Sequence, residues 1–140
     1  MRVFVPLNIG FDGGRAAFSV PDVTEAFGNW IAERGNHNQP YVTGLVYSAT
    51  GVFGWDEGGK MVVINEENAV LDVSFHPELS ANLSTEQREE TILSLVNHLG
   101  NQFDQKRIYV RSHGPAGIDV LKIYQQKGTT TPTQKIGRIK

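Results

Sequence analysis

Two adjacent glutamates, Glu66 and Glu67, are the residues of this sequence whose type and position best suit chemistry. They stand directly before residues 69–75, where apolar side chains occupy every second position, the pattern of a half-buried strand. Parity places Glu67 on the apolar face and Glu66 with Asn68 on the opposite face. A carboxylate on that second face favours a cationic ligand in an oligomer groove. The alternative is that both glutamates are ordinary charges at a hairpin edge, which discourage edge-to-edge pairing.

Three aromatic residues lie on the strand expected to pair with the Glu66 strand, namely Tyr47, Phe53 and Trp55. Such side chains form a stacking wall that holds a nucleobase, and aromatic faces attract an onium group. The alternative role for all three is packing, in the core of the domain or in a contact between subunits.

Several kinds of site are excluded or disfavoured by residues that the sequence lacks. It has no cysteine, which excludes disulfides, thiolate zinc sites, iron–sulfur clusters and a cysteine nucleophile. The Gly-x-Gly-x-x-Gly, Walker, nucleophile-elbow and His-Glu-x-x-His patterns are also missing. The four histidines are His37, His76, His98 and His113. No two are four residues apart, so no metal site is expected.

The elements that must position these residues follow from apolar periodicity and capping signals. Strands are predicted over residues 2–9, 41–55, 107–111 and 118–124, and residues 61–64 and 68–75 form the returning strand or strands after a hairpin turn. Capped helices are predicted over 19–35 and 84–100. This β-α-β-β-α-β order with an extra short strand predicts an α+β, ferredoxin-like sandwich. Both helices would cover one face of the sheet, and the other face would have little of its own to cover it.

The length of 140 residues fits one domain that can build its own core. We expect a ferredoxin-like catalytic domain over residues 1–126 and a mobile, basic, polar tail over 127–140. No apolar run approaches the roughly 18 residues that span a membrane, and the first 20 residues lack a signal-peptide core. The sequence therefore predicts a cytoplasmic protein that makes no membrane contact.

Charge is spread unevenly along the chain. Residues 61–100 carry seven acidic and one basic side chain, whereas residues 101–140 carry eight basic and two acidic ones. Complementarity within the chain or between subunits accounts for this pattern. Contact between nucleic acid and the tail is the alternative, and it is disfavoured because the tail lacks interleaved aromatic residues.

Four features together resemble a known family. They are the run Thr50-Gly51-Val52-Phe53, the pair Glu66-Glu67 heading an alternating strand, a capped helix ending near Phe103, and the run Arg107-Ile-Tyr-Val-Arg111. In order and spacing they resemble the small bacteriophage S-adenosylmethionine lyases, long called SAM hydrolases, over about residues 1–125. The pattern Trp55-x-x-x-Gly59 with Glu66 is also similar to a small uncharacterised bacterial ferredoxin-like family.

The lyase resemblance implies cleavage of S-adenosylmethionine to methylthioadenosine and homoserine lactone, by attack of the substrate's own carboxylate. It implies Glu66 as the catalytic side chain, no metal and no cofactor, and a PII-like trimer with sites between subunits. Substrate would be bound by Glu67, Phe53, Trp55 and Tyr47, although the chain has no tyrosine between 48 and 58, near the family's pocket aromatic residue. The biological role would be depletion of host S-adenosylmethionine to counter restriction. The alternative is a non-enzymatic ferredoxin-like oligomer that binds a nucleotide or another small ligand.

Overall fold

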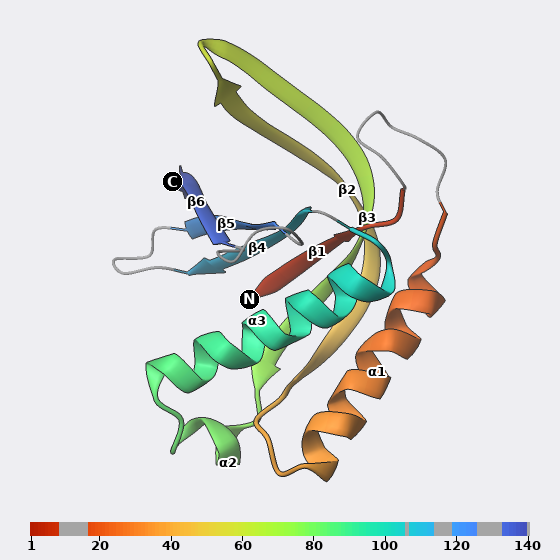
Figure 1. Cartoon of the computed structure of the whole chain (residues 1–140), viewed down its shortest axis with the longest axis vertical. Coiled ribbons are helices and arrows are strands. Elements are labelled where there is room, and N and C mark those ends of the chain that lie inside the picture. The colour runs from red at the N-terminus through yellow and green to blue at the C-terminus, as the bar shows by residue number, and fades with distance from the viewer. Residues whose placement is uncertain (9–16, 106, 114–118, 126–132, 140) are drawn as a thin grey trace.

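The computed structural model describes residues 1–8, 17–105, 107–113, 119–125 and 133–139. In chain order its elements are β1 (Arg2–Pro6), α1 (Val20–Asn36), β2 (Val42–Glu57), β3 (Lys60–Phe75), α2 (Pro77–Ser80), α3 (Thr85–Gln102), β4 (Arg107–His113), β5 (Asp119–Gln125) and β6 (Thr133–Ile139). Figure 1 shows the strands running across one side of the molecule and the long helices α1 and α3 lying against them.

The sheet has the strand order β2-β3-β1-β4-β5-β6, and every neighbouring pair is antiparallel. Its first four strands form an antiparallel sheet on which the helices pack, so the predicted α+β class is confirmed. After the hairpin turn, one strand or two were predicted over residues 61–64 and 68–75, and the structure has one continuous strand, β3. Glu66 and Glu67 therefore lie within this strand rather than before it.

Both long helices begin where their capping boxes predicted. The Ser19 side chain accepts a hydrogen bond from the Asp22 amide at 3.3 Å, and the Ser84 side chain accepts one from Gln87 at 3.1 Å. Both helices continue past the glycines at which they were expected to stop, and α3 ends at Gln102. Each helix ends with a left-handed residue directly after its cap, Asn38 at φ 54° and Asp104 at φ 49°, so an asparagine and an aspartate occupy the position that favours glycine.

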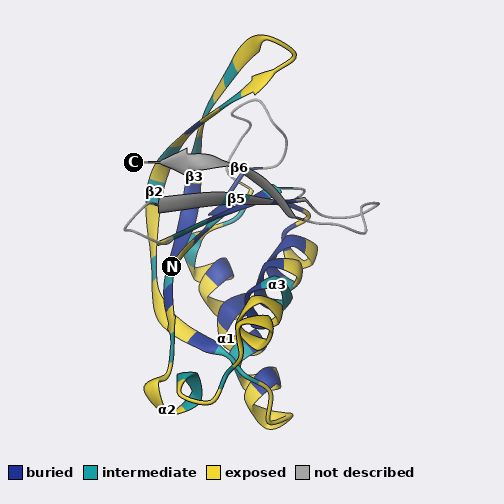
Figure 2. Ribbon diagram, turned by 90° about the vertical axis from the view of Figure 1, so that its left-hand side faces the viewer, coloured by how far each residue is buried: buried dark blue, intermediate teal, exposed yellow. Residues whose placement is uncertain are grey.

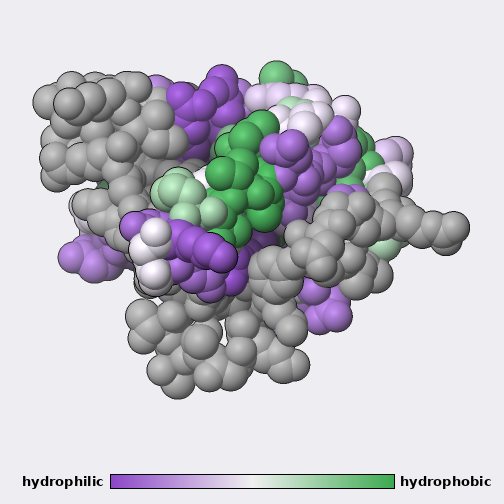
Figure 3. All heavy atoms as spheres, turned by 90° about the horizontal axis from the view of Figure 1, so that it is seen from above, coloured by the Kyte–Doolittle hydropathy of each residue, from purple (hydrophilic) through white to green (hydrophobic). Residues whose placement is uncertain are grey.

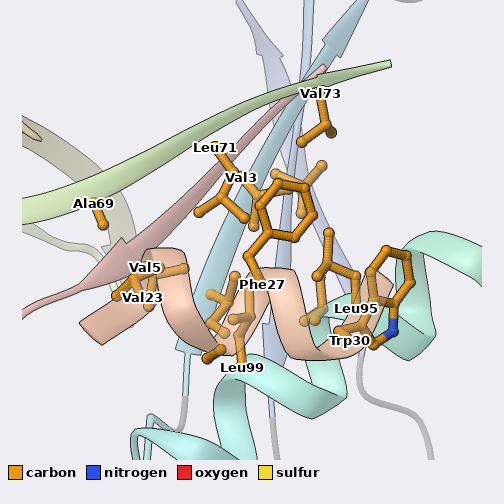
Figure 4. Packing of buried hydrophobic residues seen from close by; sticks show 14 of the residues in the cluster. Val3, Val5, Val23, Phe27, Trp30, Ala69, Leu71, Val73, Leu95 and Leu99 are labelled. Atoms are coloured by element: carbon orange, nitrogen blue, oxygen red, sulfur yellow. The ribbon is translucent and has the colours of Figure 1, made fainter. Parts of the chain in front are cut away.

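The core lies between the sheet and the two helices, which cover one face only (Figure 2). Val3, Val5 and Leu71 point from the strands toward Phe27 and Trp30 of α1 and toward Leu95 and Leu99 of α3 (Figure 4). Alternation along β3 directs Leu71 and its odd-numbered neighbours into this core. The even-numbered residues, Glu66 among them, are directed to the uncovered face, as predicted.

Two segments differ from the predictions. Pro77 was expected only to end a strand, and it begins the short helix α2, where the His76 ring accepts from the Glu78 amide at 3.3 Å. Residues 127–140 were predicted to be a mobile tail without a strand; within them Thr133–Ile139 form β6, paired with β5, and their mobility stays a prediction. Strand pairing uses backbone groups and needs no apolar period, so composition did not reveal this strand.

The hairpin of β2 and β3 extends past the other strands as an arm, which consists of residues 50–67 (Figures 1 and 2). Its turn uses Gly58 and Gly59, both at positive φ. Three apolar side chains of the arm are strongly exposed, at 62–68%: Val52, Met61 and Val63. Seen from above, hydrophobic side chains form a band flanked by hydrophilic ones (Figure 3).

No helix in the described part of the chain is both long and apolar enough to cross a membrane.

Candidate functional site

Glu66 lies on the uncovered face of the sheet, where β3 pairs with β2 at the base of the arm. Its register partner is Gly51. The carboxyl group is half-buried although no helix covers this face. Burial raises the pKa of Glu66 above its usual value, and the positive charge of Arg107 partly opposes this rise. The site therefore holds a carboxyl group that is incompletely solvated and sensitive to nearby charge.

Aromatic rings form one wall beside Glu66. Phe53 stacks on Tyr109 with ring centroids 4.1 Å apart and an angle of 4° between the rings, and Phe4 meets Phe53 edge-on at 5.8 Å. A Cβ atom placed on Gly51 would overlap the Phe53 ring. The ring thus lies over Gly51, directly across from Glu66, and only glycine leaves room for it there.

Arg107 connects the acidic and the aromatic parts of the site. Its guanidinium lies 5.1 Å from the centre of the Trp55 ring. Burial raises the pKa of the Tyr109 hydroxyl and the Glu66 charge raises it further, whereas the charge of Arg107 and a hydrogen-bonding interaction with its side chain lower it. Because the charges of Glu66 and Arg107 both act on Tyr109, the three groups form one electrostatic unit.

Two buried polar atoms at this site, the Asn68 Oδ1 and the Tyr109 hydroxyl oxygen, have no hydrogen bond of good geometry within the described residues, although the Arg107 side chain lies close enough to the hydroxyl to interact with it. The Asn68 amide nitrogen donates to the Glu66 carbonyl oxygen at 2.9 Å, which fixes the orientation of this side chain. An unsatisfied buried polar atom costs about 1–3 kcal/mol. Native proteins carry few such atoms, and functional sites are where they are expected.

The structure brings together three of the residues predicted for the site and separates two others from them. Glu66, Phe53 and Trp55 share the uncovered face around Arg107 and Tyr109.

Glu67 points to the opposite face, where it is exposed and accepts a hydrogen bond from the Thr50 hydroxyl. Tyr47 shares the face of Glu66 but pairs with Val70, four residues from Gly51, which is about 13 Å along the strand. Trp55 is as far from Gly51 in the other direction, and it is counted with the site because its ring contacts Arg107.

Sequence reasoning missed Asn68, Arg107 and Tyr109 as members of the site. Parity contained the signal for Tyr109, because Ile108 and Val110 were assigned to one face and the residue between them must point to the other. Neither its stacking on Phe53 nor the missing hydrogen-bond partners can be deduced from spacing. In the described residues, no group of three or more His, Asp or Glu side chains is placed to hold a metal ion.

An antiparallel sheet with helices on one face and an acidic-aromatic cluster on the other defines a small α+β domain with an open site. Among solved structures, the fold is similar to that of a phage SAM lyase in the apo state, at 19% sequence identity and a TM-score of 0.50. A phage SAM lyase in complex with S-methyl-5'-thioadenosine is also similar, at 18% identity and a TM-score of 0.47. Each match covers 99% of this chain and 85% of the other. No protein-family model and no curated protein matches the chain.

Proposed function

We propose that this protein is an S-adenosylmethionine lyase with Glu66 as its essential side chain. The observation that carries the proposal is a half-buried carboxyl group on the uncovered face of the sheet, beside stacked aromatic rings. The substrate offers the matching chemistry, since it has a sulfonium and an ammonium group at one end and a flat adenine at the other. The similarity of the fold to a phage SAM lyase supports the same assignment.

In this reaction a carboxylate oxygen of the substrate attacks its own γ-carbon and forms the C–O bond of a five-membered lactone. The C–S bond breaks, and its electron pair goes to sulfur, which leaves as neutral methylthioadenosine. Charge balances without a proton transfer, because the carboxylate and sulfonium charges cancel. The protein therefore needs no nucleophile or base of its own. It must hold a folded conformer of the substrate, and orientation of this kind contributes roughly up to 10 kcal/mol.

Glu66 would balance the sulfonium or position the ammonium group of the substrate. A cation beside a carboxyl group favours its ionised form, so bound substrate is expected to lower the raised pKa of Glu66. Trp55 and the Phe53–Tyr109 stack would hold the adenine ring. The two orphaned oxygens, on Asn68 and Tyr109, are acceptors close to where a cationic group would be bound.

The proposal includes a ferredoxin-like subunit that forms a PII-like trimer with sites between subunits. Leu45 is 70% exposed, and Tyr47 shares its face of β2, so the uncovered face offers apolar surface to a neighbouring subunit. Light scattering on the purified chain is expected to give three times the mass of one chain. Leu45→Arg is expected to lower that mass, whereas Val52→Arg, on the other face of the same strand, serves as the matched control.

The decisive experiment is incubation of the purified chain with S-adenosylmethionine, with products followed by liquid chromatography and mass spectrometry. Methylthioadenosine is expected together with homoserine lactone, which appears before homoserine. Glu66→Gln is expected to lower the rate by about 100-fold or more, as loss of a preorganised charge does in other sites. Glu67→Gln is the matched control, and a much smaller effect is expected because Glu67 points to the opposite face.

Other outcomes of this experiment are equally informative. Homoserine without lactone would mean that water attacks instead of the carboxylate. Intact substrate after long incubation at high protein concentration would contradict the lyase and favour an oligomer that only binds a nucleotide or another small ligand. If the lyase is confirmed, its expected role is to deplete host S-adenosylmethionine and so counter restriction.

A further inference from the structure

A second hollow lies on the helix-covered side of the sheet, away from Glu66. Its volume is about 420 Å³, and it opens between the first turns of α3 and the ends of β2, β3, β4 and β5. Its floor is apolar and consists of Val42, Val73, Ile92 and Val110. Val73 is seven residues from Glu66 along β3, roughly 23 Å, and points to the opposite face. This hollow is therefore separate from the proposed active site.

Two cationic side chains line the hollow, Arg88 and Lys122. Arg88 is held in place, since its Nη2 atom donates to the Ser80 carbonyl oxygen at 2.6 Å and its guanidinium lies 5.7 Å from the centre of the Phe75 ring. These contacts leave the other guanidinium nitrogens able to face the hollow. Arginine and lysine side chains in such a position bind carboxylates through charge-assisted hydrogen bonds.

An acidic side chain, that of Glu89, lines the same hollow as these cations. Glu89 lines the hollow and also a neighbouring one of about 380 Å³, in which Glu86 and Glu90 join it. Burial raises the pKa of Tyr124, and the Glu89 charge raises it further, so the two groups lie close together. Among the described residues, Glu89, Arg88 and Lys122 form no ion pair with one another. Opposite charges thus line one hollow without neutralising each other.

The geometry points to a binding site for a free α-amino acid with a large apolar side chain. Its carboxylate would lie between Arg88 and Lys122, its ammonium group would face Glu89, and its side chain would cover the apolar floor. This zwitterion matches all three surfaces at once, whereas a fatty acid would leave Glu89 unmatched. The volume is in the range of about 300–1,000 Å³ typical of small-molecule sites.

The test is a titration of the ¹⁵N-labelled chain with L-phenylalanine, followed by amide chemical shifts. Shifts are expected for residues that line the hollow and not for those around Glu66. N-acetyl-L-phenylalanine lacks the ammonium group and L-phenylalaninol lacks the carboxylate, so each is expected to bind about tenfold or more weakly. An absence of shifts at high concentrations of L-phenylalanine, or shifts confined to the uncovered face, would overturn the proposal.

Substitutions in the hollow test each proposed contact between the protein and the bound amino acid. Arg88→Gln is expected to weaken binding of L-phenylalanine and of its N-acetyl derivative, while Glu89→Gln weakens only the former. Ser112→Phe keeps the charges and fills the hollow, and it is expected to abolish binding. Glu66→Gln should bind L-phenylalanine as the wild type does, which separates this site from the proposed lyase activity. Thermal unfolding of each variant verifies folding, and unchanged binding in folded Arg88→Gln and Glu89→Gln would contradict the proposal.

Discussion

The two sides of the sheet differ in how fully their buried polar groups are hydrogen-bonded. On the helix-covered side, the buried Arg34 donates to the Pro40 carbonyl oxygen at 2.8 Å and to both Glu90 carboxylate oxygens at 3.0 and 3.2 Å. It also reaches the Thr91 and Ser94 hydroxyls, and it lies over the Trp30 ring. On the uncovered side, the buried Asn68 Oδ1 and Tyr109 hydroxyl have no such partner within the described residues.

This difference indicates which face is complete within one subunit. Around Arg34, the covered face satisfies its buried charge with hydrogen bonds, so these residues serve stability. The uncovered face retains an incompletely solvated carboxyl group and orphaned oxygens, each of which costs stability. Such costs fit a surface that is completed by a ligand or a neighbouring subunit. Substitutions on the two faces test this difference through their effects on stability and on activity.

The largest effect is expected from Leu95→Ala on the covered face. Leu95 is fully buried, and its truncation leaves a cavity, so the free energy of unfolding should fall by about 3 kcal/mol. Leu45→Ala on the uncovered face is the matched control, with an expected loss below about 0.5 kcal/mol for the isolated subunit. Urea unfolding measures both. Equal losses of unfolding free energy in the two variants would show that the two faces are packed equally well.

A smaller loss, about 2 kcal/mol, is expected for Arg34→Gln, which removes several charge-assisted hydrogen bonds between α1 and α3. Glu90 is 60% exposed, so water can solvate it once its partner is lost. The exposed pair of Arg2 and Asp72, at 3.4 Å, provides the control, and Arg2→Gln should cost at most about 0.5 kcal/mol. If Arg34→Gln lowers the free energy of unfolding no more than the control does, the Arg34 hydrogen bonds contribute nothing to stability.

The sequence predicted those parts of the fold that depend on local patterns. Capping boxes predicted where α1 and α3 begin, and alternation predicted that Glu66 faces away from the helices. Strand β6 could not be predicted in this way, because it depends on an available edge of β5 and not on its own composition. The helix ends were placed too early because Asn38 and Asp104, and not the preceding glycines, adopt the left-handed conformation that follows each cap.

The candidate site was predictable only in part. Glu66 and Phe53 are close in space because β2 and β3 pair locally, so a hairpin register was enough to relate them. Tyr109 and Arg107 come from β4, which reaches the site only through the order of strands in the sheet. Their contacts with Phe53 and Trp55 are tertiary, and no spacing rule predicts them.

A moderate effect is expected from Gly51→Ala, about 1–3 kcal/mol, because the new Cβ must displace the Phe53 ring. The same displacement should lower any lyase activity, since the ring lies across from Glu66. Gly54→Ala serves as the control, because a Cβ at Gly54 would lie 3.4 Å from its nearest neighbour, the Val62 carbonyl oxygen. Chemical denaturation and the product assay are read together. A stable and fully active Gly51→Ala variant would show that the ring position is unimportant.

The smallest effect is also the sharpest test of the comparison, since Glu66→Gln is expected to stabilise the fold while it removes activity. A carboxyl group whose pKa is raised in the folded state contributes stability below its unfolded pKa and loses it as pH rises through the folded value. The variant should therefore match the wild type at about pH 4 and gain stability toward about pH 8. Tyr109→Phe is the reference. The Tyr109 hydroxyl stays neutral over this range, so any gain in stability from removing it should not depend on pH. Thermal unfolding midpoints of both variants across this range give the answer. Glu66→Gln could instead show a gain in unfolding midpoint that does not change with pH, or a loss that grows with pH. Either result would show that the ionised Glu66 carboxylate does not destabilise the uncovered face.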